Sequence, residues 1–134
     1  MGENGTTTAP ERFVLVVEDN RMNLILAREV LSREGLASEP ARTGAEARAL
    51  LEERLPAAVV LDIQLPDTDG FELAAELKSD PRTRDIPIVV LSGRDLDADR
   101  ERAVGIGCAD YMTKPLDIQV FGSRLKALMG VPAD

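Results

Sequence analysis

Residues 57–70 read AAVVLDIQLPDTDG, and this stretch decides the fold class. Its first five residues form a short, uniformly apolar run of the kind found in strands buried on both faces of a parallel sheet. The run ends at a carboxylate, Asp62, and a loop rich in turn residues follows as far as Gly70. A lone carboxylate at the end of a buried strand is costly unless it has a partner. The stretch therefore predicts a sheet with a polar site at its edge.

The same order of apolar run, polar loop and helix-like segment is repeated along the chain. Strands are predicted at 13–17, 57–61, 88–91 and 111–112, with a weaker one at 36–40. Helices are predicted at 20–34, 43–54, 71–78, 96–105 and 117–129. Gly35 is expected to end the first helix, and Thr43 and Glu46 form a capping box that opens the second. Alternating strands and helices predict an α/β domain with a parallel sheet and right-handed crossovers.

Length and composition limit the remaining possibilities. The 134 residues are expected to form one domain at 11–130, with a disordered lead-in at 1–10 and a short tail at 131–134. A net charge of −8 argues against a nucleic-acid partner, which needs a basic surface. No apolar run has membrane-spanning length and the first residues do not have the pattern of a signal peptide, so a cytoplasmic location is expected. The sequence contains no histidine and one cysteine, Cys108, which excludes histidine ligands and an intramolecular disulfide.

Polar residues follow four of the predicted strands. The carboxyl ends of parallel strands share one edge of the sheet, so these residues are expected to converge. They are Glu18, Asp19, Asp62, Ser92 and Lys114. Three neighbouring carboxylates repel one another unless they are protonated or bound to a metal, and a hard cation such as Mg²⁺ relieves that repulsion. The set predicts a divalent-metal site beside a nucleophilic carboxylate.

Taken singly, these residues have simpler explanations. Glu18 and Asp19 would suit the start of a helix, where acidic groups satisfy free N–H groups. Ser92 is a plain helix-cap candidate, and Lys114 could be a solvated loop residue. Together they favour the metal site, because Lys114 would supply the countercharge that Asp62 needs and Ser92 a hydroxyl donor.

Two further acidic motifs do not fit the chemistry that they suggest. Residues 95–99 resemble the start of an EF-hand loop, but Arg100 stands where that loop requires glycine and Ile106 where it requires a bidentate glutamate. Residues 67–70, DTDG, resemble the paired-aspartate motif of haloacid-dehalogenase-type phosphatases. That motif ends a first strand, whereas here it lies in a loop after the third.

Four segments resemble the signature blocks of the CheY-like receiver domain of bacterial response regulators. They are VLVVEDN at 14–20, VVLDIQLPDTDG at 59–70, IVVLSGR at 88–94 and DYMTKP at 110–115. The resemblance covers about residues 12–129. It implies a flavodoxin-like (βα)5 fold, a doubly wound parallel sheet of five strands in the order 2-1-3-4-5. Glu18 stands where many members have aspartate, and Ser92 where threonine is common.

The resemblance also implies a chemical role for Asp62. It would accept a phosphoryl group from the phosphohistidine of a histidine kinase or a histidine phosphotransfer protein, with Ser92 and Lys114 contacting the phosphoryl oxygens. The implied Mg²⁺ ligands are Asp19, Asp62, the backbone carbonyl of Gln64 and, through a water, Glu18. Such a protein is a signalling switch rather than a turnover enzyme.

Further residues take regulatory roles by the same resemblance. Tyr111 would be the rotameric switch, Gln64 and Arg94 would tune the lifetime of the phosphoryl group, and the peptide bond before Pro115 would be cis. The downstream protein target would bind through the fourth helix, fifth strand and fifth helix.

Two classes of function remain open. The first is a phosphoacceptor switch, either free-standing or excised from a hybrid histidine kinase, in whose receivers the phrase VEDNRMN is often seen. The second is a pseudo-receiver that binds a partner without phosphorylation. The complete set of acids, hydroxyl and lysine favours the first. Too few residues follow Met129 for an output domain, so output through protein contact is expected.

The first predicted helix carries two apolar faces. Its core face is predicted to consist of Leu26, Ala27, Val30 and Leu31, which share i, i+3, i+4 spacing. Met22 and Ile25 form a second pair near the acidic residues, and we interpret them as a docking surface for a helical-bundle phosphodonor. The alternatives are that this helix is buried more widely, or that Met22 is a scattered surface residue.

Overall fold

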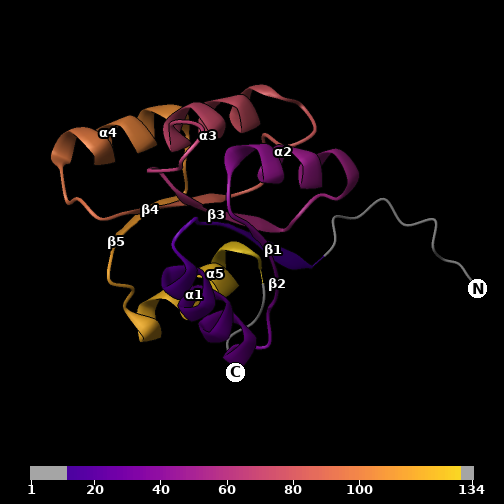
Figure 1. Cartoon of the computed structure of the whole chain (residues 1–134), viewed down its shortest axis with the longest axis vertical. Helices are drawn as coiled ribbons and strands as arrows, with labels where there is room; N and C mark the ends of the chain where they lie inside the picture. The colour runs from indigo at the N-terminus through magenta and orange to yellow at the C-terminus, as the bar shows by residue number, and fades with distance from the viewer. Residues whose placement is uncertain (1–11, 131–134) are drawn as a thin grey trace, which may run out of the picture.

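The computed structural model describes residues 12–130, in which strands and helices alternate (Figure 1). The elements are β1 (Phe13–Val17), α1 (Arg21–Arg33), β2 (Ala37–Ala41), α2 (Gly44–Glu53), β3 (Ala58–Asp62), α3 (Gly70–Ser79), β4 (Ile88–Ser92), α4 (Asp97–Ile106), β5 (Asp110–Thr113) and α5 (Ile118–Leu128). The predicted disordered lead-in and the predicted tail lie outside the described residues.

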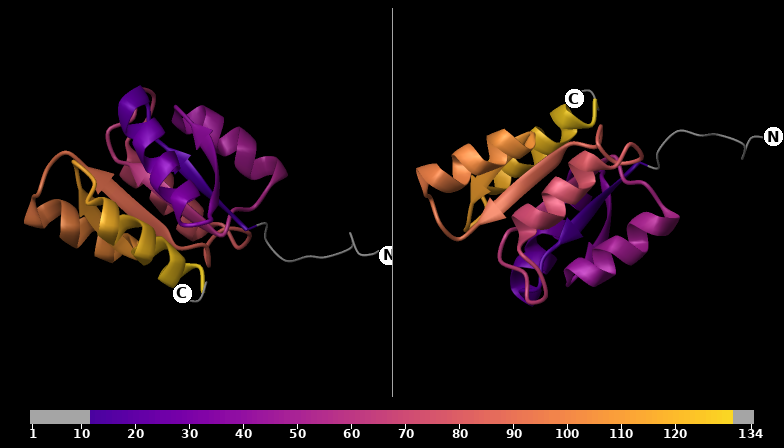
Figure 2. Two further views of the ribbon diagram at one scale, coloured as in Figure 1. Left: turned by 90° about the horizontal axis from the view of Figure 1, so that it is seen from below. Right: turned by 90° about the horizontal axis from the view of Figure 1, so that it is seen from above.

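The strands form one parallel sheet in the order β2-β1-β3-β4-β5, which confirms the predicted fold. Helices α1 and α5 cover one face of the sheet, and α2, α3 and α4 cover the other (Figures 1 and 2). Strands β1, β3 and β4 are buried throughout because both of their faces meet helices. Along β1, Val14 and Val16 pack toward the α1 and α5 side, whereas Leu15 and Val17 belong to the opposite core.

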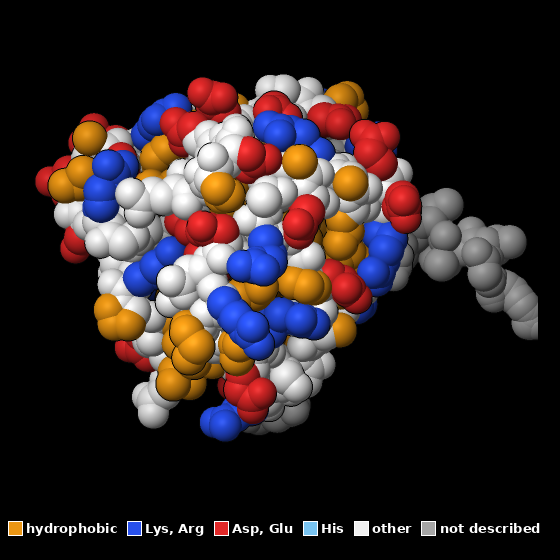
Figure 3. Space-filling view, viewed as in Figure 1, with side chains coloured by type: hydrophobic (Ala, Val, Ile, Leu, Met, Phe, Trp, Pro, Cys, Tyr) orange, Lys and Arg blue, Asp and Glu red, His pale blue; other side chains and the backbone are white. Residues whose placement is uncertain are grey.

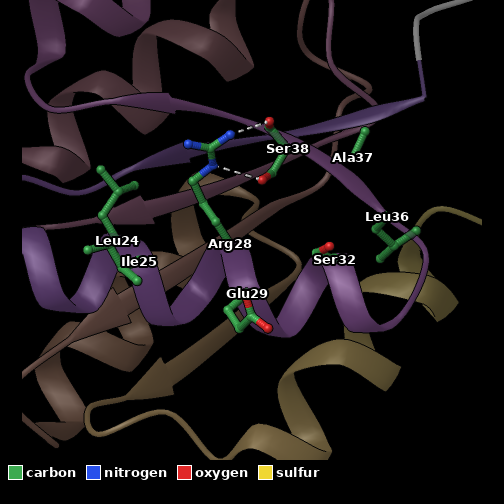
Figure 4. Close-up of a pocket in the computed structure, with 8 residues that line it drawn as sticks. All are labelled: Leu24, Ile25, Arg28, Glu29, Ser32, Leu36, Ala37 and Ser38. Carbon is green, nitrogen blue, oxygen red and sulfur yellow. Dashed lines mark hydrogen bonds between the residues drawn. The ribbon is translucent and has the colours of Figure 1, made fainter.

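Strand β2 lies at an edge of the sheet and differs from the central strands. It runs over Ala37–Ala41, one residue later than predicted, and it is mostly exposed or half-buried. Pro40 is tolerated there because an edge strand needs no partner for every N–H group. The guanidinium of Arg28 on α1 donates to the side-chain and backbone oxygens of Ser38, both at 3.1 Å (Figure 4). This contact ties the edge strand to α1.

Helix α1 buries a slightly different face from the predicted one. Its buried residues are Leu24, Ala27, Val30 and Leu31, and Leu26 is only half-buried. Leu24 stands three residues before Ala27 and so belongs to the same stripe on the helix surface. Gly35 ends the helix with a positive φ of 78°, as predicted.

The acidic motif at 67–70 organises the loop between β3 and α3. The two carboxylate oxygens of Asp67 accept hydrogen bonds from the N–H groups of Gly44 (2.8 Å) and Ala45 (2.9 Å) at the start of α2. These two bonds lower the pKa of Asp67. Asp69 caps α3 by accepting from the N–H group of Phe71 at 2.8 Å. The motif therefore fixes the loop that follows Asp62.

Gly70 allows this loop to close against β3. A Cβ atom at residue 70 would lie 2.5 Å from both the carbonyl oxygen of Asp62 and the Cα of Ile63. We expect Gly70→Ala to reduce the free energy of unfolding by about 1–3 kcal/mol, because these backbone atoms must shift. Gly105→Ala is the matched control, because nothing lies within 4 Å of the Cβ position of residue 105 inside α4. This substitution should increase the free energy of unfolding by at most about 1 kcal/mol, since alanine favours a helix more than glycine does. Urea denaturation of both variants measures the difference, and equal effects would contradict this view of Gly70.

Within residues 12–130, no helix combines the length and the apolar character needed to cross a membrane.

Candidate functional site

The predicted site residues meet at the carboxyl edge of the sheet. Glu18 and Asp19 follow β1, and Asp62 ends β3. Each of these three side chains has a carboxylate oxygen within 4.8 Å of those of the other two. Glu18 and Asp62 are buried, whereas Asp19 is more open to solvent. Three acidic groups therefore share a small volume that is only partly open to water.

Lys114 supplies the countercharge to this acidic cluster. Its Nζ lies 2.9 Å from Oε1 of Glu18 and 3.2 Å from Oδ2 of Asp62. The backbone positions it, since the N–H group of Lys114 donates to the carbonyl of Ser92 at 2.8 Å and the bond between Lys114 and Pro115 is cis. Burial acts to lower the pKa of Lys114, but the two carboxylates outweigh it and the net shift is upward. The lysine therefore remains charged at neutral pH.

Glu18 is the most strongly desolvated acid of the cluster. Burial raises its pKa, and the nearby Asp62 raises it further, whereas Lys114 acts in the opposite direction. Its Oε2 accepts from the N–H group of Asn20 at 3.1 Å. Its buried Oε1 is paired with the ammonium group of Lys114 at 2.9 Å. One ammonium group thus pairs with two of the three clustered carboxylates, so negative charge is in excess in the cluster.

This donor set fits a hard divalent cation. Mg²⁺ prefers oxygen ligands, takes one or two carboxylates together with water, and would relieve the repulsion among the three acids. The loop after β3 orients the side chain of Asp62, because the N–H group of Gln64 donates to its Oδ1 at 2.9 Å. The sequence located this cluster correctly, but it could not show that Glu18 would lie closer to Lys114 than Asp62 does.

Ser92 is connected to Tyr111 through the backbone of Arg94. The buried Oγ of Ser92 accepts from the N–H group of Arg94 at 2.9 Å. The hydroxyl of Tyr111 donates to the carbonyl of Arg94 at 2.8 Å, and its ring is buried. The hydroxyl at the end of β4 and the aromatic ring on β5 are thus two hydrogen bonds apart.

Met22 and Ile25 are exposed on α1, at 71% and 49% of their accessible surface. The alternative that the helix buries this side is therefore wrong. Four further large apolar side chains, which sequence reasoning did not single out, are exposed on or next to α4 and α5: Leu96, Val104, Ile118 and Val120. On the face drawn in Figure 3, cationic side chains gather over the centre with apolar side chains beside them.

Comparison with known proteins gives a consistent result. The sequence profile of the response regulator receiver domain matches residues 14–126. The polar-differentiation response regulator DivK of Brucella ovis is 34% identical over 119 residues, which are 89% of this chain and 97% of that protein. The receiver domain of a signal transduction histidine kinase from Syntrophus aciditrophicus superposes with a TM-score of 0.82 and 30% identity, over 90% of this chain and 91% of that chain. The phosphorylated cyanobacterial phytochrome response regulator RcpA superposes with a TM-score of 0.80 and 28% identity, over 92% and 97%.

Proposed function

Because the chain belongs to the response regulator receiver domain family, we propose that it is a phosphoacceptor switch in which Asp62 takes a phosphoryl group from a partner's phosphohistidine. Receiver domains are signalling switches that interact with histidine kinases and downstream targets. One observation carries the proposal for this chain: a buried carboxylate, Asp62, ends a strand beside Lys114 and clusters with two further acids. A structural ion pair with Lys114 would require only one of these acids.

The same acids are the proposed Mg²⁺ ligands. Asp19, Asp62 and the backbone carbonyl of Gln64 would hold the ion directly, and Glu18 through a water. Bound there, Mg²⁺ would supply positive charge to the transferring phosphoryl oxygens. The excess of negative charge supports this assignment, because three carboxylates cluster beside a single ammonium group.

The chain's own residues account for the rest of the proposed transfer. A carboxylate oxygen of Asp62 attacks phosphorus, the P–N bond of the phosphohistidine breaks, and the imidazole leaves with the electron pair. The N–H group of Gln64 orients Asp62 by its bond to Oδ1. Lys114, kept protonated by its acidic neighbours, offsets negative charge on the phosphoryl oxygens, and Ser92 can donate its hydroxyl to one of them.

The proposed output follows from the contact between Ser92 and Arg94. If Ser92 turns toward a phosphoryl group on Asp62, its Oγ no longer accepts from Arg94, whose carbonyl holds Tyr111. We propose that the surface of α4, β5 and α5 responds and binds the downstream protein. Val104 on α4 and Ile118 on α5 give that surface exposed apolar groups. We propose a protein partner and not a nucleic acid. We also propose that the protein acts in the cytoplasm.

Labelling with acetyl phosphate tests the proposed function. Labelled protein should form only with Mg²⁺ and should lose its label in hydroxylamine, as acyl phosphates do and serine phosphates do not. The chain has no histidine, so phosphohistidine cannot account for the label. If neither acetyl phosphate nor a histidine donor labels the protein, the pseudo-receiver alternative replaces the proposal. The likeness to the receiver domain of a histidine kinase supports an alternative proposal, in which this receiver domain belongs to a hybrid histidine kinase.

Mg²⁺ is expected to raise the thermal stability of the unphosphorylated protein. The cation relieves the repulsion among Glu18, Asp19 and Asp62, and a ligand at 100 times its Kd adds about 2.7 kcal/mol to the free energy of unfolding. Melting curves with and without millimolar Mg²⁺ measure the shift. Asp19→Asn should reduce it, and identical curves for the wild type would contradict the metal site.

Met22→Ser and Ile25→Ser are expected to slow phosphotransfer from a histidine donor while leaving labelling by acetyl phosphate near the wild-type rate. Both side chains are exposed on α1, so the substitutions remove docking contacts without opening the core. Val104→Ser is the matched control, since it removes an exposed apolar residue from α4. If both reactions slow equally in the α1 variants, the docking interpretation is wrong.

A further inference from the structure

The end of the edge strand β2 carries a cation beside the acidic cluster. Arg42 follows Ala41, the last residue of β2, and β2 pairs with β1 along its whole length. The N–H group of Glu18 donates to the carbonyl of Ala41 at 2.9 Å, so the backbone just before Arg42 is joined to the backbone of the cluster. Sequence reasoning did not single out Arg42, because it follows the weakly predicted strand.

The guanidinium of Arg42 is not used by the nearest acid in the sequence. Oε1 of Glu46 accepts from the backbone N–H group of Arg42 at 2.9 Å, as part of the capping box that opens α2. The guanidinium instead donates to the backbone carbonyl of Asp19 at 3.4 Å. Arg42 is exposed, and within residues 12–130 its side chain makes no ion pair. Its positive charge is therefore not offset by a carboxylate in contact with it.

This charge lies within electrostatic range of the acidic cluster. Only a few covalent bonds separate the carbonyl of Asp19 from its carboxylate, which approaches those of Glu18 and Asp62 to within 4.8 Å. The Debye length is about 10 Å at 0.1 M ionic strength, so the charge of Arg42 is only partly screened from the cluster. Lys114 contacts two of the acids directly, whereas Arg42 acts from the side of Asp19, the more open acid.

We propose that Arg42 is a second cation of the site, which attracts the anionic phosphodonor and opposes the binding of Mg²⁺. This inference rests on the proposed function, because it concerns the approach of the phosphoryl group that Asp62 accepts. A positive charge beside the site lowers the energy of an approaching phosphoryl dianion and raises that of a divalent cation. Arg42 thereby favours donors of higher negative charge.

A purely structural role of Arg42 would have the opposite effect on the metal. If its bond to the carbonyl of Asp19 only held the loop after β1 in place, loss of the side chain would misplace Asp19 and weaken the binding of Mg²⁺. Removal of a repelling charge strengthens that binding instead. The sign of the change in Mg²⁺ affinity therefore separates the two roles.

The experiment compares the wild type with Arg42→Gln, which removes the charge, and Arg42→Lys, which keeps it. Arg84→Gln is the matched control: Arg84 is exposed, lies in the loop before β4 at the opposite edge of the sheet, and makes no ion pair in the part of the chain that the structure describes. Isothermal titration calorimetry gives the Kd of Mg²⁺ for each unphosphorylated protein. The rate of labelling is then measured at saturating Mg²⁺ with acetyl phosphate and with phosphoramidate.

Arg42→Gln should lower the Kd of Mg²⁺ by roughly two- to five-fold and should slow labelling by acetyl phosphate by a similar factor. Phosphoramidate carries a protonated amine and a smaller net negative charge, so its rate should fall less. Both effects should largely disappear in about 1 M salt, where the Debye length is about 3 Å. Arg42→Lys and Arg84→Gln should remain near the wild type in both measurements.

Four results would overturn a part of this account. If Arg42→Gln matches the wild type in both measurements, the second cation is refuted while the proposed function stands. Weaker binding of Mg²⁺ by that variant would make Arg42 a structural support for Asp19. Tighter binding of Mg²⁺ with an unchanged rate for acetyl phosphate, or equal losses for the two donors, would refute the attraction of the donor. If Arg42→Gln binds Mg²⁺ more tightly but neither donor labels any form of the protein, the effect on Mg²⁺ stands and the proposed function is contradicted.

Discussion

Asp62→Asn is expected to abolish labelling of the protein by acetyl phosphate. The amide keeps the shape of the side chain and can still accept from the N–H group of Gln64, but it is not a nucleophile. Removal of the nucleophile should reduce the rate by roughly 10³-fold or more. Quantitative autoradiography of the wild type and the variant, at equal Mg²⁺, measures the ratio.

A second aspartate of the same loop provides the control for this prediction. Asp67 bonds to the N–H groups of Gly44 and Ala45 and lies outside the acidic cluster. Asp67→Asn should therefore retain its label even if it is less stable. Full labelling of Asp62→Asn, or loss of label from both variants, would contradict the assignment of Asp62 as the phosphoacceptor.

Lys114→Met is expected to cause the largest loss of stability that a single site residue can produce. It removes the cation from Glu18 and Asp62, both of which are buried, and breaking a buried pair costs about 3–5 kcal/mol. Mg²⁺ should restore part of the lost stability, because it replaces the missing positive charge among the acids. Urea denaturation with and without Mg²⁺ gives both quantities.

Lys126→Met is the matched control for the lysine. Lys126 pairs with Glu34 at 3.5 Å, and that glutamate is substantially exposed, so its loss should cost less than about 1 kcal/mol and should not respond to Mg²⁺. A wild-type-like Lys114→Met, or equal losses for the two lysines, would contradict the electrostatic account of the site.

The sequence predicted most of the fold because its central strands are short, uniformly apolar runs. Strands β1, β3 and β4 agree with the predictions to within a residue, and the order of the sheet is confirmed. Strand β2 was placed one residue early, since an edge strand with Pro40 carries little apolar signal. The predicted core face of α1 did not include Leu24, because Leu24 lies before the first residue of the apolar pattern that was recognised.

The candidate site could be predicted in outline but not in detail. Strand ends in a parallel sheet must converge, so Asp62 and Lys114 could be brought together from their positions alone. Lys114 lies closer to Glu18 than to Asp62, and this difference depends on side-chain conformations that the spacing of residues in the sequence does not determine. The ion pairs of Asp99 with Arg94 and of Asp95 with Arg100 could not be predicted from the sequence, because the turn between β4 and α4 sets them.

The phosphoacceptor can be identified without any substitution. Protein labelled by a histidine donor is reduced with borohydride, which converts an aspartyl phosphate to homoserine, and then digested and sequenced by mass spectrometry. The account predicts homoserine at residue 62 and unmodified aspartate at residues 19, 67 and 69. Homoserine at any of those other positions, or a stable phosphate on a serine or threonine, would contradict the central claim that Asp62 carries the phosphoryl group.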